Sequence, residues 1–355
     1  MGAKKGLSMR RFKGADGERF SVLVDSEGMP LFYPTLFSTW IPRGSSLAAN
    51  TIANALSALK ALLAWEAQRG IDLESSFARG VLLDSNEIRD LCDFLERPIE
   101  REKPVRVAPI RRRREIVGAS EHYFRVTTAA QYLEFLAHRV APQVADSDVK
   151  NMGSKIRECL PHKGAWLTTD RIEAHLSEEV IETIEAALRP DSADNPASDR
   201  GVQLRNALMF SILKHTGIRR GELLNLRVGD FNFGDSTMAV LRRADSSLDT
   251  RRHQPTVKTL SRRVRLAPAL TEKVHAYVMG ARRAVPGAKR HDYLFVTHKS
   301  GPTQGAPLSI GAFNKWMGLI SGVVEKSGFH AHALRHNWNY DFSRLGKRCT
   351  NQPSA

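Results

Sequence analysis

The strongest constraint on how this chain folds is a set of polar residues that lies in three segments far apart in the sequence. A guanidinium group presents paired, planar donors that fit the oxygens of a phosphate, and an ammonium group cannot reproduce that geometry. A fold that uses these side chains together must bring segments near residues 219, 258 and 335 to one place. The candidate residues are Arg219, Glu222, Lys258, His332, Arg335 and His336.

The net charge of the chain indicates a polyanionic partner. Its 355 residues include 53 Lys and Arg against 38 Asp and Glu, which leaves a net charge of +15. Such an excess is typical of proteins that bind nucleic acid. A basic protein that is merely soluble, or one that binds RNA in general, has the same charge, so the motifs must distinguish these classes.

The cysteines and the chain start predict a reducing cytoplasmic location. Cys92, Cys159 and Cys349 are scattered, with neither metal-ligand spacing nor an even-numbered disulfide framework. The first residues lack the apolar core of a signal peptide, and no apolar run is long enough to span a bilayer. With a DNA partner, we expect association with the nucleoid.

The first 160 residues predict a mostly helical domain after a small β-hairpin. The hairpin is expected from strands at 20–24 and 30–33, which flank a turn at 26–28. Apolar side chains that recur at helical spacing then predict four helices. The helices are expected at 46–69, 85–95, 128–140 and 147–160, the second of them behind a capping box that starts at Asp84.

A proline-containing basic segment from Arg97 to Gly118 interrupts these helices. It is expected to be an extended loop, and its charge density favours contact with the phosphate backbone over a solvated linker. We also predict a DNA contact by a lysine in the 46–69 helix. The candidate DNA-binding residues are Arg111, Arg112, Arg113, Arg114 and Lys60.

The second half predicts helices around a small antiparallel sheet. Ser177 is the expected N-cap of the first helix. Further helices are expected at 204–215, 223–226, 308–320 and 332–345, strands at 237–242, 256–259 and 262–266, and a strand or buried connection at 292–297. The predicted class is therefore mainly α with a small antiparallel β-sheet (α+β). The predicted boundaries are a hairpin extension 1–34, a helical domain 35–160, a linker 161–176, a second domain 177–346 and an irregular tail 347–355.

The three motifs together resemble those of the tyrosine recombinases, the phage integrase family. They are Thr-Gly-Ile-Arg-x-x-Glu-Leu at 216–223, the lysine of a β-hairpin at 258, and His-x-Leu-Arg-His at 332–336. The resemblance covers roughly 177–346, and the helical N-terminal half is similar to the core-binding domain of that family only in outline. It implies two domains that clamp duplex DNA, a homotetramer on paired sites, and chemistry that needs neither ATP nor a metal.

The resemblance also implies a role for most of the candidate residues. Arg219 and Arg335 would bind the non-bridging oxygens of a phosphate under attack, where negative charge accumulates. Lys258 would protonate the departing 5′ oxygen. Glu222 would orient the site, and His332 would assist in phosphate binding and proton transfer.

The helix expected at 332–345 leaves two questions about its histidines open. His332, Arg335 and His336 lie at i, i+3 and i+4, so one helix face can present all three. His336 could contact the phosphate or simply pack in the core. His330, His332 and His336 could instead bind a metal, as in a metal-dependent nuclease, although no carboxylate or cysteine accompanies them at ligand spacing.

The departure from the family pattern concerns the nucleophile. The family has a His or Trp and then an attacking tyrosine well beyond its second arginine, whereas only 20 residues follow Arg335 here (355 minus 335). Tyr340 is the one tyrosine among them, and at i+5 it points about 140° away from Arg335 on a helix. We expect Tyr340 to pack and the chain to be truncated or frame-shifted near Gly346. The expected function is a recombinase that binds DNA without cleaving it, or a non-catalytic protein that occupies recombination sites.

Overall fold

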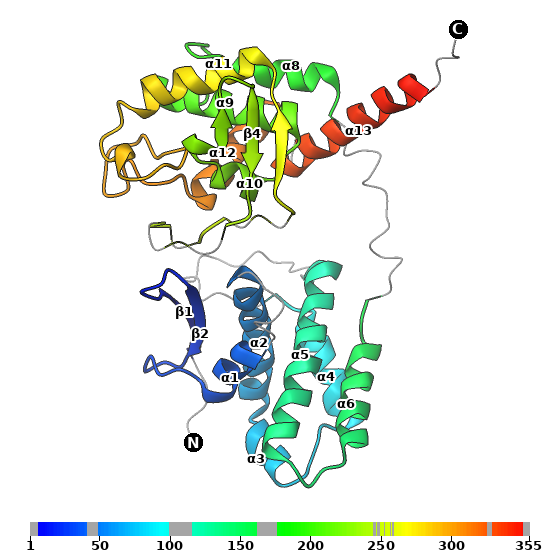
Figure 1. Cartoon of the computed structure of the whole chain (residues 1–355). Helices are drawn as coiled ribbons and strands as arrows, with labels where there is room; N and C mark the ends of the chain where they lie inside the picture. The colour runs from blue at the N-terminus through cyan, green and yellow to red at the C-terminus, as the bar shows by residue number, and fades with distance from the viewer. Residues whose placement is uncertain are drawn as a thin grey trace, which may run out of the picture. The chain divides into compact units, whose positions relative to one another are not determined.

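The computed structural model describes residues 6–40, 49–98, 116–161, 176–243, 246, 249–251, 253–255, 257, 259–324 and 329–350. Side chains are described for these ranges except for residue 49 and residues 344–350. The chain divides into two compact units (Figure 1). Unit 1 comprises residues 1–13 and 19–168. Unit 2 comprises residues 14–18 and the chain from residue 169.

The N-terminal hairpin of unit 1 differs from the predicted one. Strand β1 (Ser8–Lys13) pairs antiparallel with β2 (Arg19–Val24). The predicted second strand at 30–33 is wrong, because Pro30 forms only an isolated bridge to Val24 and helix α1 (Phe32–Trp40) follows at once. The turn predicted at 26–28 is present, since the Asp25 carboxylate accepts the backbone N–H groups of Glu27 and Met29. The apolar side chains after it recur at helical rather than alternating spacing, so α1 buries Phe37.

In the described residues of unit 1, five further helices surround one core. The capping box predicted at Asp84 is confirmed, because its carboxylate accepts the Asn86 and Glu87 N–H groups while the Glu87 carboxylate accepts the Asp84 N–H. The helix predicted from 128 begins nine residues earlier, since Val126 and the stem of Arg125 are already buried on its inner face. The helices are α2 (Ala49–Arg69), α3 (Leu73–Ala78), α4 (Ser85–Leu95), α5 (Ala119–Val140) and α6 (Asp146–Glu158).

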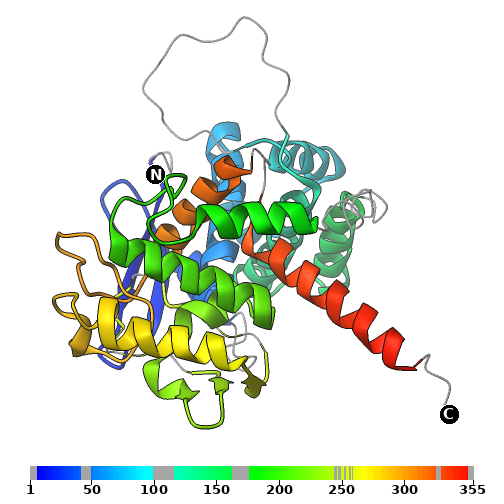
Figure 2. The ribbon, with the colours of Figure 1, turned by 90° about the horizontal axis from the view of Figure 1, so that it is seen from above.

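Unit 2 is built around a central buried helix, α9 (Arg200–Thr216), which packs against α11 (Pro268–Tyr277) and α13 (Ala331–Thr350). Figure 2 shows α9 beside α11, and α13 projecting beyond the rest of the unit. Ser177 caps α8 (Glu178–Ala187) as predicted, through its hydroxyl and the Val180 N–H. The remaining helices are α10 (Arg220–Asn225) and α12 (Ile310–Val323). The final helix ends at Thr350, beyond the predicted end at 345, and so overlaps the tail predicted from 347.

The sheet of unit 2 has three antiparallel strands in the order β3-β4-β5. Strands β4 (Thr237–Val240) and β5 (Arg262–Arg265) match the prediction, but the third strand is β3 (Phe231–Asn232). The strand predicted at 256–259 is wrong for its described residues, because Val257 turns into the core and the Thr259 hydroxyl bonds a side chain of α10. Segment 292–297 is a buried connection with isolated bridges at Tyr293 and Val296. The mainly helical α+β class is confirmed.

None of the helices in the described part of the chain combines the length and the apolar character needed to cross a lipid bilayer.

The turn between α9 and α10 depends on a glycine under an aromatic ring. Gly217 ends α9 in the left-handed conformation, with φ of 57°. A Cβ at this position would lie 2.7 Å from the ring of Trp338 on α13. The Trp338 Nε1–H donates to the His215 carbonyl at 3.1 Å, which fixes the indole over the turn.

We therefore expect Gly217→Ala to destabilise the protein by about 1–3 kcal/mol, because the new methyl group meets both backbone strain and the indole ring. Urea unfolding followed by circular dichroism measures this loss. Gly229→Ala is the matched control, since a Cβ there meets nothing within 4 Å. Equal losses for both variants would contradict this account of the turn.

Candidate active site

Arg219 lies where α10 begins. Its backbone N–H donates to Oε2 of Glu222 at 2.9 Å, so the carboxylate satisfies an N–H that the helix itself leaves open. The Arg219 side chain is 40% exposed, yet its Nη1 is buried and has no hydrogen-bond partner among the residues that the structure describes. A guanidinium that is partly exposed and has a nitrogen without a hydrogen bond is suited to an anionic ligand.

The Glu222 carboxylate joins three segments of unit 2. It is fully buried, and Oε1 accepts the Thr259 hydroxyl at 2.6 Å. Arg262 on β5 donates to both carboxylate oxygens, at 3.2 and 2.8 Å, and Arg219 Nη1 lies 3.6 Å from Oε1. Burial opposes the charge, but the hydrogen bonds from Arg262, Thr259 and the Arg219 backbone lower the pKa of Glu222 to about 2. The carboxylate is therefore ionised at neutral pH, and its role in orienting the site stays a prediction.

Arg262 is a site residue that the sequence did not reveal. Its guanidinium is about one-third exposed and grips Glu222 in the bidentate arrangement that favours Arg over Lys. It also donates to the Thr259 hydroxyl at 2.8 Å. The alternation of side chains along a strand could have indicated it. Arg262 lies on the same, half-buried face of β5 as Val264, whereas Arg263 and Arg265 are exposed.

Arg335 reaches the same turn from α13. Its Nη1 donates to the Gly217 carbonyl at 2.5 Å, two residues before Arg219. Burial and then the charge of Arg219 lower the pKa of Arg335 from its usual value, as expected for two cations held close together. The fold thus brings together the two arginines that the sequence predicted, beside one buried carboxylate.

The histidines of α13 lie on the exposed side of this cluster. The rings of His332 and His336 are 4.3 Å apart in an edge-to-face arrangement, and both residues are exposed. His336 is therefore not packed in the core. Burial, followed by the neighbouring His336, His330 and Arg335, lowers the pKa of His332, so this ring is mostly neutral at pH 7. In the described part of the chain, no three His, Cys, Asp or Glu side chains are placed so that together they could hold a metal ion.

Several predicted site residues remain untested by this structure. Lys258 lies outside the described residues, although its neighbours Val257 and Thr259 are a core residue and a partner of Glu222. The arginine run 111–114 also lies outside them. Lys60 is half-buried on α2 in unit 1, and its contact with DNA stays a prediction.

The described tyrosines of unit 2 are engaged away from the arginines or turned to solvent. The Tyr277 hydroxyl bonds His298 Nε2 at 3.0 Å, and the Tyr293 hydroxyl donates to the Asp249 carboxylate at 3.2 Å. Tyr340 is 49% exposed, so it is only partly covered, and the expectation that it packs stays a prediction. Its two neighbours in the chain, Asn339 and Asp341, are also exposed.

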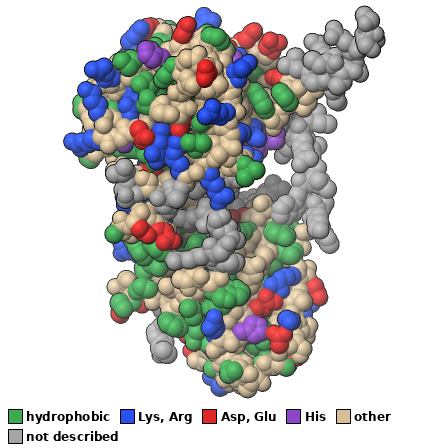
Figure 3. All heavy atoms as spheres, in the orientation of Figure 1, with side chains coloured by type: hydrophobic (Ala, Val, Ile, Leu, Met, Phe, Trp, Pro, Cys, Tyr) green, Lys and Arg blue, Asp and Glu red, His purple; other side chains and the backbone are tan. Residues whose placement is uncertain are grey.

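The surface of unit 2 is rich in basic side chains. Figure 3 shows Lys and Arg side chains gathered on the visible face of this unit. Strand β5 carries the exposed Arg263 and Arg265 as well as Arg262. A surface of this kind is suited to a phosphate backbone.

The pKa of Glu222 predicts a specific pH dependence. Its usual value of 4.5 falls to about 2 in the folded protein, so its stabilising contribution is present above pH 4.5 and is lost as the pH falls through about 2. Glu222→Gln should cost on the order of 3 kcal/mol at pH 7, and the difference from wild type should shrink between pH 5 and 3. Urea unfolding at several pH values tests this, with the exposed Glu272→Gln as control; a pH-independent difference would contradict it.

Comparisons with known proteins agree with this geometry. Residues 175–347 match the model of the phage integrase family. A tyrosine recombinase XerD from Halalkalibacterium halodurans (strain C-125) is 27% identical over 159 residues, which are 44% of this chain and 45% of that protein. The match therefore spans about half the length of the curated relative.

Two solved structures are also similar. The XerA recombinase is 16% identical with a TM-score of 0.36, covering 88% of this chain and 85% of that one. XerH recombinase bound to its difH substrate is 15% identical with a TM-score of 0.42, covering 88% and 84%. The family-model match takes in all three motifs, from Arg219 to His336. Residues 175–347 of this chain are therefore similar to the phage integrase family, the tyrosine recombinases.

Proposed function

We propose that this protein is a site-specific recombinase that breaks and rejoins duplex DNA through a phosphotyrosine link. One observation supports this most directly. Arg335 is bonded to the Gly217 carbonyl beside Arg219, whose buried Nη1 has no hydrogen-bond partner in the described part of the chain. Two guanidiniums held this way suit the non-bridging oxygens of one phosphate.

The residues divide the work of strand cleavage as follows. A tyrosine hydroxyl gives up its proton, which the neutral His332 ring can accept, and its oxygen attacks phosphorus. The bond to the 5′ oxygen breaks, and that oxygen takes a proton, for which the resemblance to the family points to Lys258. Arg219 and Arg335 stabilise the charge that gathers on the phosphate oxygens. Rejoining reverses these steps, so the phosphotyrosine conserves the bond energy and neither ATP nor a metal is required.

His332 has a role that its electrostatics favour. Because its pKa is lowered, its neutral ring can hydrogen-bond the phosphate without adding a third full charge to the cluster. Its edge-to-face neighbour His336 keeps the ring on the exposed side of α13. We assign His332 to phosphate binding and proton transfer and His336 to support of that ring.

The working assembly extends beyond unit 2. We propose that the helical domain at 35–160 and the catalytic domain at 177–346 bind opposite sides of duplex DNA, with four protomers on two sites. The arginine run 111–114 and Lys60 would contact phosphates on the side of the first domain. Such a protein would act at the nucleoid.

A second candidate function is occupation of recombination sites without cleavage. The observation that favours it concerns the tyrosines of unit 2 that the structure describes. Tyr277 and Tyr293 hold other partners, and Tyr340 lies about 140° around α13 from Arg335. In that case the same arginines would bind the phosphate, and an intact relative would supply the nucleophile.

Covalent capture separates the two functions. The full chain is incubated with a library of nicked duplexes of random central sequence, and protein–DNA species that survive SDS are isolated. Adducts whose linked tyrosine is identified by mass spectrometry support the recombinase, and Tyr340→Phe shows whether Tyr340 carries them. Binding without adducts supports occupation alone, and no preference for duplex DNA contradicts both.

The phosphate-binding role of the arginines predicts a change in salt dependence. Arg219→Ala and Arg335→Ala should each reduce the slope of log affinity against log salt for a duplex by about 1, because each loses one phosphate contact. Fluorescence anisotropy over a range of salt concentrations measures the slope. Arg283→Ala, an exposed arginine without a described contact to the site, is the control. Unchanged slopes in the first two variants would contradict the assignment.

A further inference from the structure

The helix that carries the candidate site is short and is held at both ends by side chains. Helix α10 has six residues, fewer than an isolated helix needs for stability in water. Glu222 satisfies the Arg219 N–H at its start. At its end the last carbonyls have no partners within the helix. These carbonyls therefore need hydrogen-bond donors from outside α10.

Two arginines from the connection between β4 and β5 reach these carbonyls. Arg251 Nη1 donates to the Leu224 carbonyl at 2.8 Å, and Arg243 Nη1 donates to the Asn225 carbonyl at 3.4 Å. A cation at the C-terminal end of a helix is favourable, since the helix dipole is negative there. Two guanidinium groups thus donate hydrogen bonds to the carbonyls at the C-terminal end of α10.

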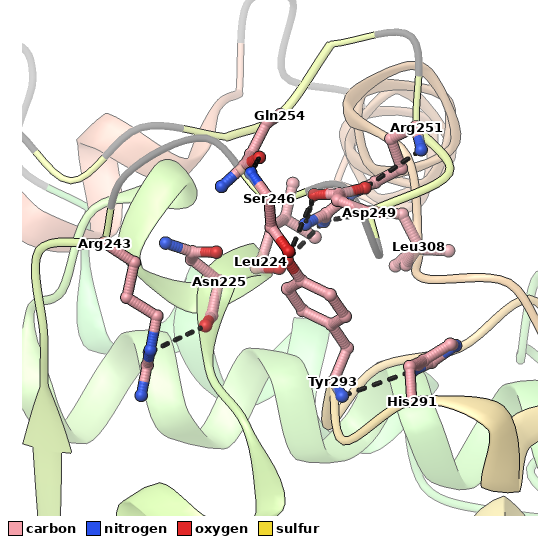
Figure 4. Close-up of polar contacts among 10 residues, drawn as sticks. All are labelled: Leu224, Asn225, Arg243, Ser246, Asp249, Arg251, Gln254, His291, Tyr293 and Leu308. Carbon is pink, nitrogen blue, oxygen red and sulfur yellow. Dashed lines mark hydrogen bonds and ion pairs between the residues drawn. The ribbon is translucent and has the colours of Figure 1, made fainter. Parts of the chain in front are cut away.

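Arg251 is itself fixed by a buried network. Figure 4 shows its guanidinium, the Asp249 carboxylate and the Tyr293 ring converging next to Leu224 and Leu308. Arg251 Nη2 donates to Asp249 Oδ2 at 2.8 Å, and the side chains of Asp249 and Arg251 are 0% and 3% exposed. The Tyr293 hydroxyl donates to the same carboxylate, and its ring lies 4.6 Å from the guanidinium carbon.

The same guanidinium joins α10 to the start of α12. Arg251 Nη1 also donates to the Leu308 carbonyl at 3.1 Å. Leu308 is buried and stands two residues before α12. Arg251 therefore connects α10, the 292–297 connection and the approach to α12 at one point.

Arg243 forms a second, smaller anchor. It makes a two-point ion pair with Asp230, whose Oδ2 also accepts the Arg227 N–H at 2.8 Å. The chain that leaves α10 is thereby tied back to the β4–β5 connection. Both arginines act on the same end of the helix.

A buried ion pair of this kind needs a reason other than stability. Apolar residues of similar volume often stabilise a protein as well as a buried ion pair does, because desolvation of the charges is costly. Arg251 is also too buried to contact DNA, at 6% exposed. Its contacts instead define where α10 sits, and α10 carries Arg219 and Glu222.

We propose that Arg251, held by Asp249 and Tyr293, is a positioning residue that fixes α10 so that Arg219 meets the phosphate together with Arg335. The role of Arg219 at the phosphate rests on the proposed function, but the contacts by which Arg251 holds α10 do not depend on bound DNA. Loss of Arg251 should loosen α10 more than the rest of unit 2 and should displace Arg219.

Hydrogen exchange tests the anchoring without DNA. In Arg251→Met, the amides of 219–226 should lose protection about tenfold more than those of α11 and α12. Arg205→Met is the matched control, because Arg205 is also buried and donates to a carbonyl, that of Val296 at 3.1 Å. Tyr293→Phe keeps the ring and should give a smaller effect of the same kind. A uniform loss in all variants would overturn the proposal.

A double-mutant cycle tests the consequence for the phosphate site. Arg251→Met should reduce the salt slope of duplex binding by up to about 1, although its side chain cannot reach a phosphate. Combining it with Arg219→Ala should add little, since both remove the same contact. The slope does not depend on the folded fraction, so a merely structural role leaves it unchanged. Additive reductions would overturn the proposal, whereas failure of Arg219→Ala alone would concern the proposed function.

Discussion

The candidate site depends on one buried carboxylate, that of Glu222. It is fully enclosed and accepts hydrogen bonds from the Arg219 backbone, the Thr259 hydroxyl and the Arg262 guanidinium. A carboxylate buried without such partners would be protonated or would destabilise the fold. Because its partners come from the α9–α10 turn, residue 259 and β5, the ionised form is compatible with only one arrangement of these segments.

The second constraint is the close approach of α13 to the glycine turn. A side chain at Gly217 would occupy the space of the Trp338 ring, and the Gly217 carbonyl accepts a hydrogen bond from Arg335. The residue that allows the turn therefore also holds the Arg335 side chain two residues before Arg219. Two like charges at such a distance repel, and an anion between them relieves that repulsion. The geometry and the electrostatics thus favour the same ligand.

The sequence predicted those parts of the fold that depend on local signals. The capping box at Asp84 and the N-cap at Ser177 lie where short-range hydrogen bonds decide a helix start, and both were found. The strand predicted at 256–259 failed because the Thr259 hydroxyl turns to Glu222, a partner 37 residues away that no local pattern reveals. For the same reason the motifs contained Arg219, Glu222 and Arg335, whereas the contacts of Arg262 with Glu222 and of Arg251 with Leu224 join residues far apart in the sequence.

The most direct measurement is the location of a tetrahedral oxyanion in crystals of the full chain. Tungstate resembles phosphate in shape and charge and is located by its anomalous scattering. The account predicts a tungstate ion within hydrogen-bond distance of both the Arg219 and the Arg335 guanidinium, and its loss in Arg219→Ala. Tungstate bound only at other surface arginines, with this position empty at saturating concentration, would contradict the central claim that the two arginines bind one phosphate.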